Sequence, residues 1–127
     1  MEIQEIKIPH ITLGWNDWYR WAELLKDNRS GGIHIPSKIP GVYEVKLTGH
    51  DGRLTIGKAA DIRMRIRQGL IKGKTQHSSG KEIRSYEDTD KIEIRWAITD
   101  RPSAVEEELH RQYVIKHGKW PKYTKHT

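Results

Sequence analysis

The last third of the chain carries carboxylates on a predicted helix. Pro102 opens a helix that runs to about His117, since a proline near the first turn costs no hydrogen bond. At about 100° per residue, one arc of this helix is apolar and holds Ala104, Val105, Leu109 and Ile115. Glu108 falls inside that arc, whereas Glu106 and Glu107 are expected to be solvated near the helix N-terminus. Because a buried carboxylate needs a partner, Glu108 should meet a metal ion or an arginine, or form a structural salt bridge.

A tyrosine and three arginines are further candidates for chemistry. Tyr43 lies on the apolar face of the alternating segment Gly41 to Leu47. A buried tyrosine there usually packs with its hydroxyl hydrogen-bonded. The periodic segment that follows carries Arg63, Arg65 and Arg67, and helical geometry alone does not choose between them.

Charge is unevenly distributed along the chain, whose formal net charge is +6. Residues 58–85 hold eight Lys or Arg against two acids, and residues 112–127 hold four lysines and no acid. Between them, residues 86–111 carry eight acids against four bases. This pattern indicates a surface that binds a polyanion beside a carboxylate site. A solvated basic surface is the alternative.

Length and composition bound the class of protein. With 127 residues, 35% hydrophobic and 31% charged, the chain is expected to form one globular domain. No apolar run approaches the roughly 20 residues that span a bilayer, so no membrane role is expected. The start shows no signal-peptide pattern. The chain has no cysteine, which excludes thiolate metal sites and fits a cytoplasmic location.

Residues 1–35 are predicted to form an N-terminal appendage. Ile6 and Ile8 alternate with polar residues and suggest a short strand. Asn16 can then cap a helix whose apolar stripe holds Trp18, Trp21, Ala22 and Leu25. The cluster Asn28 to Gly32 ends it. Such a stripe is usually core, and stacking on bases is the alternative.

Residues 36–127 read as β-β-α-β-α. The predicted elements are strands Gly41 to Leu47 and Arg53 to Ile56, a helix Ala59 to Leu70, a loop Ile71 to Gly80, a strand Ile92 to Ile98, and the last helix. The turn from Thr48 to Gly52 joins the first two strands as a hairpin. The fold class is therefore α+β, a small three-stranded antiparallel sheet flanked by helices with the N-terminal strand and helix appended.

Within this domain, several motifs resemble the GIY-YIG nuclease family. Gly41-Val42-Tyr43 is followed after eleven residues by Thr55-Ile56-Gly57, which is the spacing of the family's two tripeptides. Arg65 stands eight residues after Gly57, where the family has its arginine, and Ala104 with Glu108 matches its alanine–glutamate pair. Pro121-Lys122-Tyr123 resembles the Pro-x-Tyr that follows in the excision-repair branch.

Two residues depart from the family pattern. Thr55 replaces the usual tyrosine of the second tripeptide, and Thr124 stands where many members have asparagine. The family's histidine four residues beyond the arginine is also missing after Arg65. These differences bear on activity more than on fold.

The resemblance implies a hydrolase that cuts DNA phosphodiester bonds as an endonuclease. Glu108 would ligate one Mg²⁺, for which Mn²⁺ could substitute. Tyr43 would act as general base on water, and Arg65 would clamp the phosphoryl oxygens. Lys58 would lower the pKa of the tyrosine or hold a phosphate. A catalytically weak or inactive nucleic-acid-binding module on the same fold is the alternative, and a basic interaction domain with coincidental motifs is a third reading.

The partner implied is double-stranded or branched DNA. Its backbone is expected to contact basic residues of the helix and loop, namely Arg63, Arg67, Lys72, Lys74, His77 and Lys81. Of these, His77 is also a candidate accessory catalytic group. Restriction, repair and mobile-element roles all remain open, and a restriction role would need a homodimer to cut both strands.

Overall fold

The two seven-residue strands that the sequence predicts, Gly41–Leu47 and Ile92–Ile98, are the inner strands of the sheet. In the computed structural model, which describes residues 12–26 and 32–124, the fold is α+β with a four-stranded antiparallel sheet of order β1-β4-β2-β3. The elements are β1 (Tyr19–Arg20), α1 (Trp21–Leu25), β2 (Gly41–Leu47), β3 (Thr55–Ala59), the π-helix η2 (Met64–Ile71), α2 (Ser78–Tyr86), the 3₁₀ turn η3 (Thr89–Lys91), β4 (Ile92–Ile98) and α3 (Pro102–His117). The predicted bounds of β2, β4 and α3 are confirmed.

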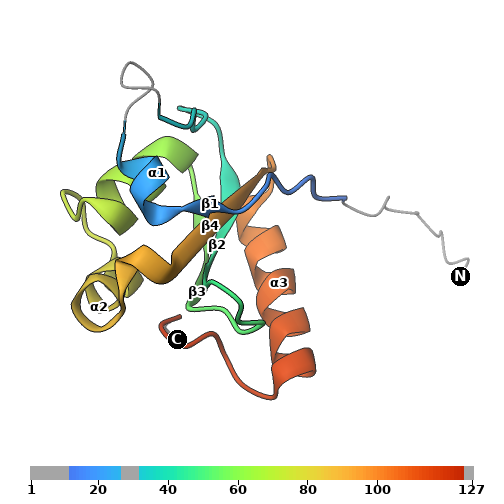
Figure 1. Cartoon of the computed structure of the whole chain (residues 1–127). Helices are drawn as coiled ribbons and strands as arrows, with labels where there is room; N and C mark the ends of the chain where they lie inside the picture. Colours follow the sequence, from blue (N-terminus) through green and yellow to red (C-terminus); the bar gives the residue numbers. More distant parts are fainter. Residues whose placement is uncertain (1–11, 27–31, 125–127) are drawn as a thin grey trace, which may run out of the picture.

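The sheet separates two layers (Figure 1). On one face, Tyr43 and Val45 of β2 and Ile94 of β4 join the main core, which α1, η2 and α2 cover. On the other face, Val42 of β2 and Val105 of α3 belong to a smaller cluster between the sheet and that helix. Strands β2 and β4 therefore have buried side chains on both faces of the sheet. Strand β3 is the open edge on one side of the sheet, and β1 forms the other edge.

The N-terminal segment supplies a fourth strand of the sheet, β1, which the sequence did not predict. Tyr19 pairs with Ile94, so β1 extends the sheet beside β4. The prediction that Asn16 caps a helix is wrong. Its side-chain oxygen instead accepts a hydrogen bond from the Trp96 amide at 2.7 Å. The helix consequently begins only at Trp21. The strand predicted around Ile6 and Ile8 lies outside the described residues.

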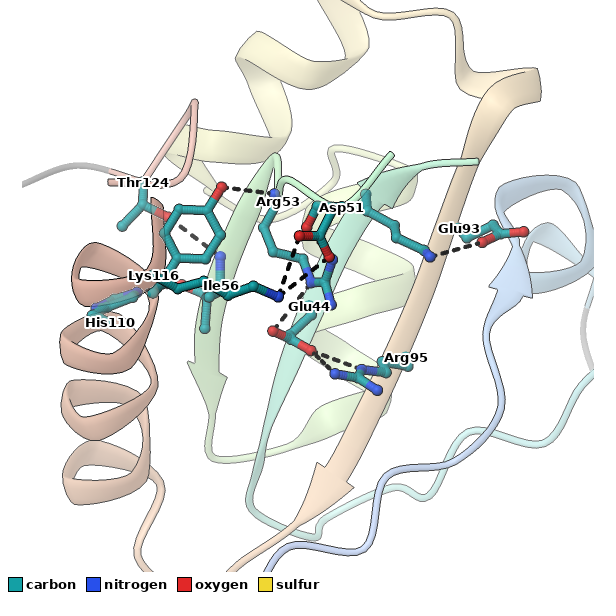
Figure 2. Close-up of polar contacts among 11 residues, drawn as sticks. Glu44, Asp51, Arg53, Ile56, Glu93, Arg95, His110, Lys116 and Thr124 are labelled. Carbon is teal, nitrogen blue, oxygen red and sulfur yellow. Dashed lines mark hydrogen bonds and ion pairs between the residues drawn. The ribbon is translucent and has the colours of Figure 1, made fainter. Parts of the chain in front are cut away.

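The predicted aromatic stripe divides between the two layers. Trp21 is buried in the main core, as the packing interpretation expects. Trp18 instead lies against cations on the other face of the sheet, with the Arg95 guanidinium 4.6 Å from its ring centroid. The buried Glu44 carboxylate pairs with both Arg53 and Arg95 (Figure 2), so it balances one of the two guanidinium charges.

The segment between β3 and β4 differs most from its prediction. Strand β3 continues through Gly57 to Ala59, and the following helix is a π-helix. In it the Lys72 amide donates to the Arg67 carbonyl, five residues back, at 3.0 Å. The predicted loop ends at Ser78, where α2 begins with His77 as its N-cap. Among the described residues, no helix is long and apolar enough to cross a membrane.

Arg67 is a structural residue and not a surface cation. Its side chain is buried, and its guanidinium donates to the carbonyls of Leu24, Lys26 and Ile33 at 3.3, 3.1 and 3.3 Å. These bonds tie the N-terminal segment to η2. The prediction that Arg67 contacts DNA phosphates does not fit this placement.

We expect Arg67→Met to lower the free energy of unfolding by about 2–4 kcal/mol, because buried carbonyls lose their charged donor. Denaturant titration measures the change. Lys72→Met, at an exposed position one π-helical turn beyond Arg67, is the control and should change stability by less than about 0.5 kcal/mol. Equal stability of the two variants would contradict the structural role of Arg67.

Candidate active site

A pocket opens at the free edge of β3, where the two layers of the fold meet. Chemically active side chains from β2, β3, η2, the loop before α2, and α3 line it: Tyr43, Lys58, Arg65, His77, Glu106 and His110. Tyr43, Lys58 and Arg65 were predicted as catalytic residues, and the structure brings these three together. Glu108 is absent from the lining and Glu106 takes part instead.

Gly57 allows the tyrosine to reach this edge. Tyr43 and Gly57 are directly opposite in the β2–β3 register. A Cβ atom on Gly57 would lie 2.4 Å from the Tyr43 hydroxyl oxygen and 2.5 Å from Cζ. The ring therefore passes over the glycine on its way to the pocket. Gly41 has a comparable role, because a Cβ there would lie 2.5 Å from Cδ1 of Ile62 at the start of the next helix.

Gly57→Ala should displace the Tyr43 ring and destabilise the fold by about 1–3 kcal/mol, since an added methyl group overpacks the site. Thermal unfolding measures the stability, and the NMR signals of the His77 ring report the displacement. Gly14→Ala is the matched control, because a Cβ there meets no atom within 4 Å. If Gly57→Ala left both the stability and the His77 signals unchanged, the close approach of Tyr43 would be wrong.

The Tyr43 hydroxyl is held by a histidine. The His77 Nε2 atom lies 2.6 Å from the hydroxyl oxygen, and both side chains are buried. His77 Nδ1 accepts a hydrogen bond from the Gly80 amide at 2.9 Å. A neutral imidazole with Nδ1 as acceptor carries its proton on Nε2, so His77 donates to the tyrosine oxygen. His77 is thus a partner of Tyr43, and the prediction that it contacts DNA does not fit its burial.

Burial sets the protonation states of this pair. It raises the pKa of Tyr43 to about 12, and the neighbouring Arg65, through its charge and a hydrogen bond, opposes that increase. The negative charge of Glu106 adds to the rise. Burial, with the charges of Arg65 and Arg84, lowers the pKa of His77 to about 4. At neutral pH both groups are therefore uncharged, and the histidine keeps the Nε2 proton that it donates.

Arg65 connects η2 to the loop that carries His77. Its guanidinium donates to the Gln76 carbonyl at 3.0 Å, and it lines the pocket beside Tyr43. Arg63 points elsewhere, because its Nε atom donates to the Ile35 carbonyl at 2.5 Å. The structure thus distinguishes Arg65 from Arg63 and Arg67, which helical geometry alone could not do.

The prediction that Glu108 faces inward is wrong. Its side chain is 48% exposed and pairs with Arg111, whose Nε atom donates to it at 2.9 Å. These hydrogen bonds, first of all the one from Arg111, lower the pKa of Glu108 to about 2. The buried face of α3 instead follows Val105 and Tyr113.

Glu106 is the carboxylate that α3 presents to the pocket. It is half-buried and lies one position beyond Val105, on the same side of the helix as His110. It lines the same pocket as Tyr43, and its negative charge contributes to the raised pKa of that tyrosine. Glu106 was expected to be a solvated acid, and the structure places it, partly exposed, in the lining of the pocket.

Lys58 and His110 complete the rim of the pocket. The Lys58 ammonium donates to the Ser103 hydroxyl at 3.0 Å, which links β3 to the first turn of α3. The His110 Nε2 atom lies 2.9 Å from the Ile56 carbonyl, and Thr124 accepts from the Ile56 amide (Figure 2). His110 thereby fixes α3 against the edge strand, a role that its sequence position did not reveal.

The two departures from the family pattern touch each other. The Thr55 hydroxyl lies 3.1 Å from that of Thr124 and donates to Ser79 at 3.3 Å. Ser79 in turn donates to the Tyr123 carbonyl at 2.9 Å. All three hydroxyl-bearing residues line the pocket. The replacements at residues 55 and 124 thus form one connected hydroxyl cluster rather than two separate losses.

The remaining predicted DNA contacts lie on the surface. Lys72, Lys74 and Lys81 are exposed. Lys74 and Lys81 line a groove that adjoins the candidate pocket through the shared residues His77 and Ser78. A cationic surface therefore continues outward from the pocket.

The donor set of the pocket fits a weakly held divalent ion. Among the described residues, no group of three His, Cys, Asp or Glu side chains converges on one point. Glu106 offers one carboxylate to the pocket. Mg²⁺ commonly binds through one or two carboxylates, several waters and the substrate phosphate. Glu106 could therefore hold Mg²⁺ together with a bound phosphodiester.

The chain was compared with protein-family models, with curated proteins and with solved structures, and none matched. The chemical indications of function lie in the side chains of the pocket. They combine a phenol, a guanidinium, an imidazole and a carboxylate in one hollow of the sheet edge.

Proposed function

We propose that the chain is a metal-dependent endonuclease of the GIY-YIG type that hydrolyses phosphodiester bonds in DNA. The observation that supports this most is the convergence of Tyr43, Arg65 and Glu106 in one pocket at the edge of β3. The tripeptide motifs meet there because Tyr43 crosses Gly57. A coincidental match of motifs would not require this close approach.

In the proposed mechanism Tyr43 is the general base. Its hydroxyl first loses a proton to solvent, and the phenolate then takes a proton from the attacking water and returns to the phenol. The phenolate is favoured by the Nε2–H of His77 and by the Arg65 guanidinium. Because burial raises the pKa of Tyr43 to about 12, proton removal depends on these two donors and on nearby substrate. His77 is a positioning residue, since it acts through the tyrosine.

Arg65 and Lys58 stabilise the charge that builds up on the phosphoryl oxygens. Arg65 lies beside the base and can donate to two oxygens of one phosphate. Lys58 supplies a point charge at the rim, where it contacts Ser103. Glu106 would hold the Mg²⁺ ion, which shields the phosphate and stabilises the departing oxyanion.

The DNA backbone is proposed to enter over the cationic groove beside the pocket. Lys74 and Lys81 are exposed there. Contacts between lysines and phosphates release counterions, so binding should weaken steeply with added salt. Double-stranded and branched DNA both offer such a backbone.

A nucleic-acid-binding module without catalysis is the second candidate. It is favoured by the Thr55–Thr124 pair in place of the family's tyrosine and asparagine. The high pKa of Tyr43 also disfavours the phenolate in the free protein. This candidate shares the cationic groove but requires no metal.

The two candidates differ in one assay. The purified chain is incubated at low salt with supercoiled plasmid and with end-labelled duplex and branched oligonucleotides, in Mg²⁺, Mn²⁺ or EDTA. The nuclease nicks the plasmid only with a divalent ion, and the labelled products identify the preferred substrate. Salt-sensitive binding without cleavage in either metal would support the binding module. Absence of both binding and cleavage would overturn both candidates.

A further inference from the structure

One face of α3 carries an exposed stripe of four residues, in a groove that shares Glu106 and His110 with the pocket. Ala104, Glu108, Arg111 and Ile115 are spaced by four, three and four positions, so they fall within one narrow arc of the helix. All four are exposed, and the Ile115 side chain is 71% accessible. They line a shallow groove that Trp120 borders. Ala104, Val114, Ile115 and Trp120 line this groove together, and an exposed apolar patch rimmed by polar side chains is typical of an interaction surface.

The stripe is complementary to itself when it is reversed. Glu108 and Arg111 are equally far from the helix position midway between Leu109 and His110, and so are Ala104 and Ile115. A two-fold axis through that point would set Glu108 against the partner's Arg111 and Ala104 against the partner's Ile115. Opposite charges would then meet at the centre, and a large side chain would meet a small one at each end.

We infer that this stripe joins two copies of the chain through antiparallel packing of their α3 helices. Such a contact is isologous, as in most homodimers. Glu108 and Arg111 already pair within one chain, with an Arg111 Nη2 to Glu108 Oε1 distance of 2.5 Å. In the dimer each ion pair would face its symmetry mate with opposite charges in register. Ile115 would lose its exposure to water by packing over Ala104.

Charge favours a second copy over other occupants. DNA is disfavoured because Glu107 and Glu108 give this face negative charge near the start of α3. A basic peptide would match these acids but would meet Arg111. One helix pair buries less surface than a standard interface, so we expect a weak dimer that dissociates on dilution.

The dimer does not depend on the proposed nuclease activity. The groove of this stripe shares Glu106 and His110 with the candidate pocket, but sedimentation reports association without DNA or metal, and nicking reports cleavage without a measurement of association. Association and cleavage can therefore be tested separately, and failure of one does not imply failure of the other.

Charge reversal tests the register in solution. Sedimentation equilibrium across a concentration series should show dimers of the wild-type chain. Glu108→Arg or Arg111→Glu alone should weaken association by about tenfold or more, because like charges then meet across the axis. The double variant restores opposite charges and should restore the dimer. Thermal melting of each variant verifies that the monomer still folds, since each single variant also replaces the ion pair within one chain by two like charges.

Cysteine cross-linking provides a second test, because the chain contains no native cysteine. Ala104→Cys and Ile115→Cys proteins, mixed and oxidised, should cross-link to each other. Ala104→Cys alone should cross-link poorly, since its two copies would lie about 16 Å apart along the helix axis. A wild-type chain that stays monomeric at all concentrations, or equal cross-linking in both experiments, would overturn the inference.

Discussion

Glu106→Gln is expected to reduce DNA cleavage by at least about a hundredfold, whereas Glu108→Gln leaves it within about twofold. The first substitution removes the carboxylate that lines the pocket and is proposed to hold Mg²⁺. Loss of a metal ligand removes the charge stabilisation that the ion supplies to the phosphate and the leaving oxygen. Glu108 pairs with Arg111 on the opposite side of the helix, so its amide variant is a matched control.

Single-turnover cleavage of a labelled duplex in Mg²⁺ measures this difference. DNA affinity in EDTA should be equal or slightly higher for Glu106→Gln, because the variant loses a negative charge near the phosphate. Raising the Mg²⁺ concentration should recover part of its activity if the ion is still held by the substrate. A larger loss in Glu108→Gln than in Glu106→Gln would reverse the assignment of the metal ligand.

Cleavage by the wild-type chain is expected to accelerate about tenfold per pH unit between about pH 6 and 9. The rate rises with pH because Tyr43 acts as a base only in its deprotonated form. Because burial raises the Tyr43 pKa to about 12, the phenolate fraction increases tenfold with each unit below that value. The plot of log-rate against pH should show no inflection from His77 near pH 6.5, since burial and adjacent arginine charges lower the pKa of His77 to about 4.

His77→Gln separates positioning from proton transfer. The variant should lose about tenfold to a hundredfold in rate, because the tyrosine oxygen loses a buried donor, yet its log-rate should keep the same slope against pH. Denaturant titration establishes whether the N-cap of α2 survives the change. A rate that is independent of pH, or that falls above pH 7, would exclude Tyr43 as the base.

The strand positions of the site were predictable from the sequence. Period-two alternation in Gly41–Leu47 and Ile92–Ile98 specifies which side chains share a face, and both strands are confirmed. The hairpin then sets Tyr43 opposite Gly57, as the register shows. The spacing of the two tripeptides is therefore enough to predict that Tyr43 lies opposite Gly57.

The helical part of the site was harder to predict, for two physical reasons. Ala104 and Ile115 are apolar but exposed, so including them shifted the inferred buried arc of α3 toward Glu108 and away from Glu106. In the preceding segment, the wider π-helical turn changes the direction of successive side chains. A wheel drawn at the α-helical angle could not choose Arg65.

The contribution of α2 depends on tertiary contacts. Its first turn has two serines and a glycine, which resemble loop residues when read locally. His77 caps the helix through the Gly80 amide while its other nitrogen reaches Tyr43, far away in the sequence. This dual contact, and the Thr55–Thr124 hydroxyl pair, appear only once the chain is folded.

The most direct test of the central claim is metal-dependent nicking of supercoiled plasmid by the wild-type chain beside Tyr43→Phe, with DNA binding measured on the same samples. Phenylalanine keeps the ring over Gly57 and removes only the hydroxyl. We expect equal binding, nicking by the wild type in Mg²⁺ but not in EDTA, and a loss of about 10² to 10⁴ in the variant's rate. Equal nicking by both proteins, or DNA binding without nicking by the wild type in any metal, would contradict the account.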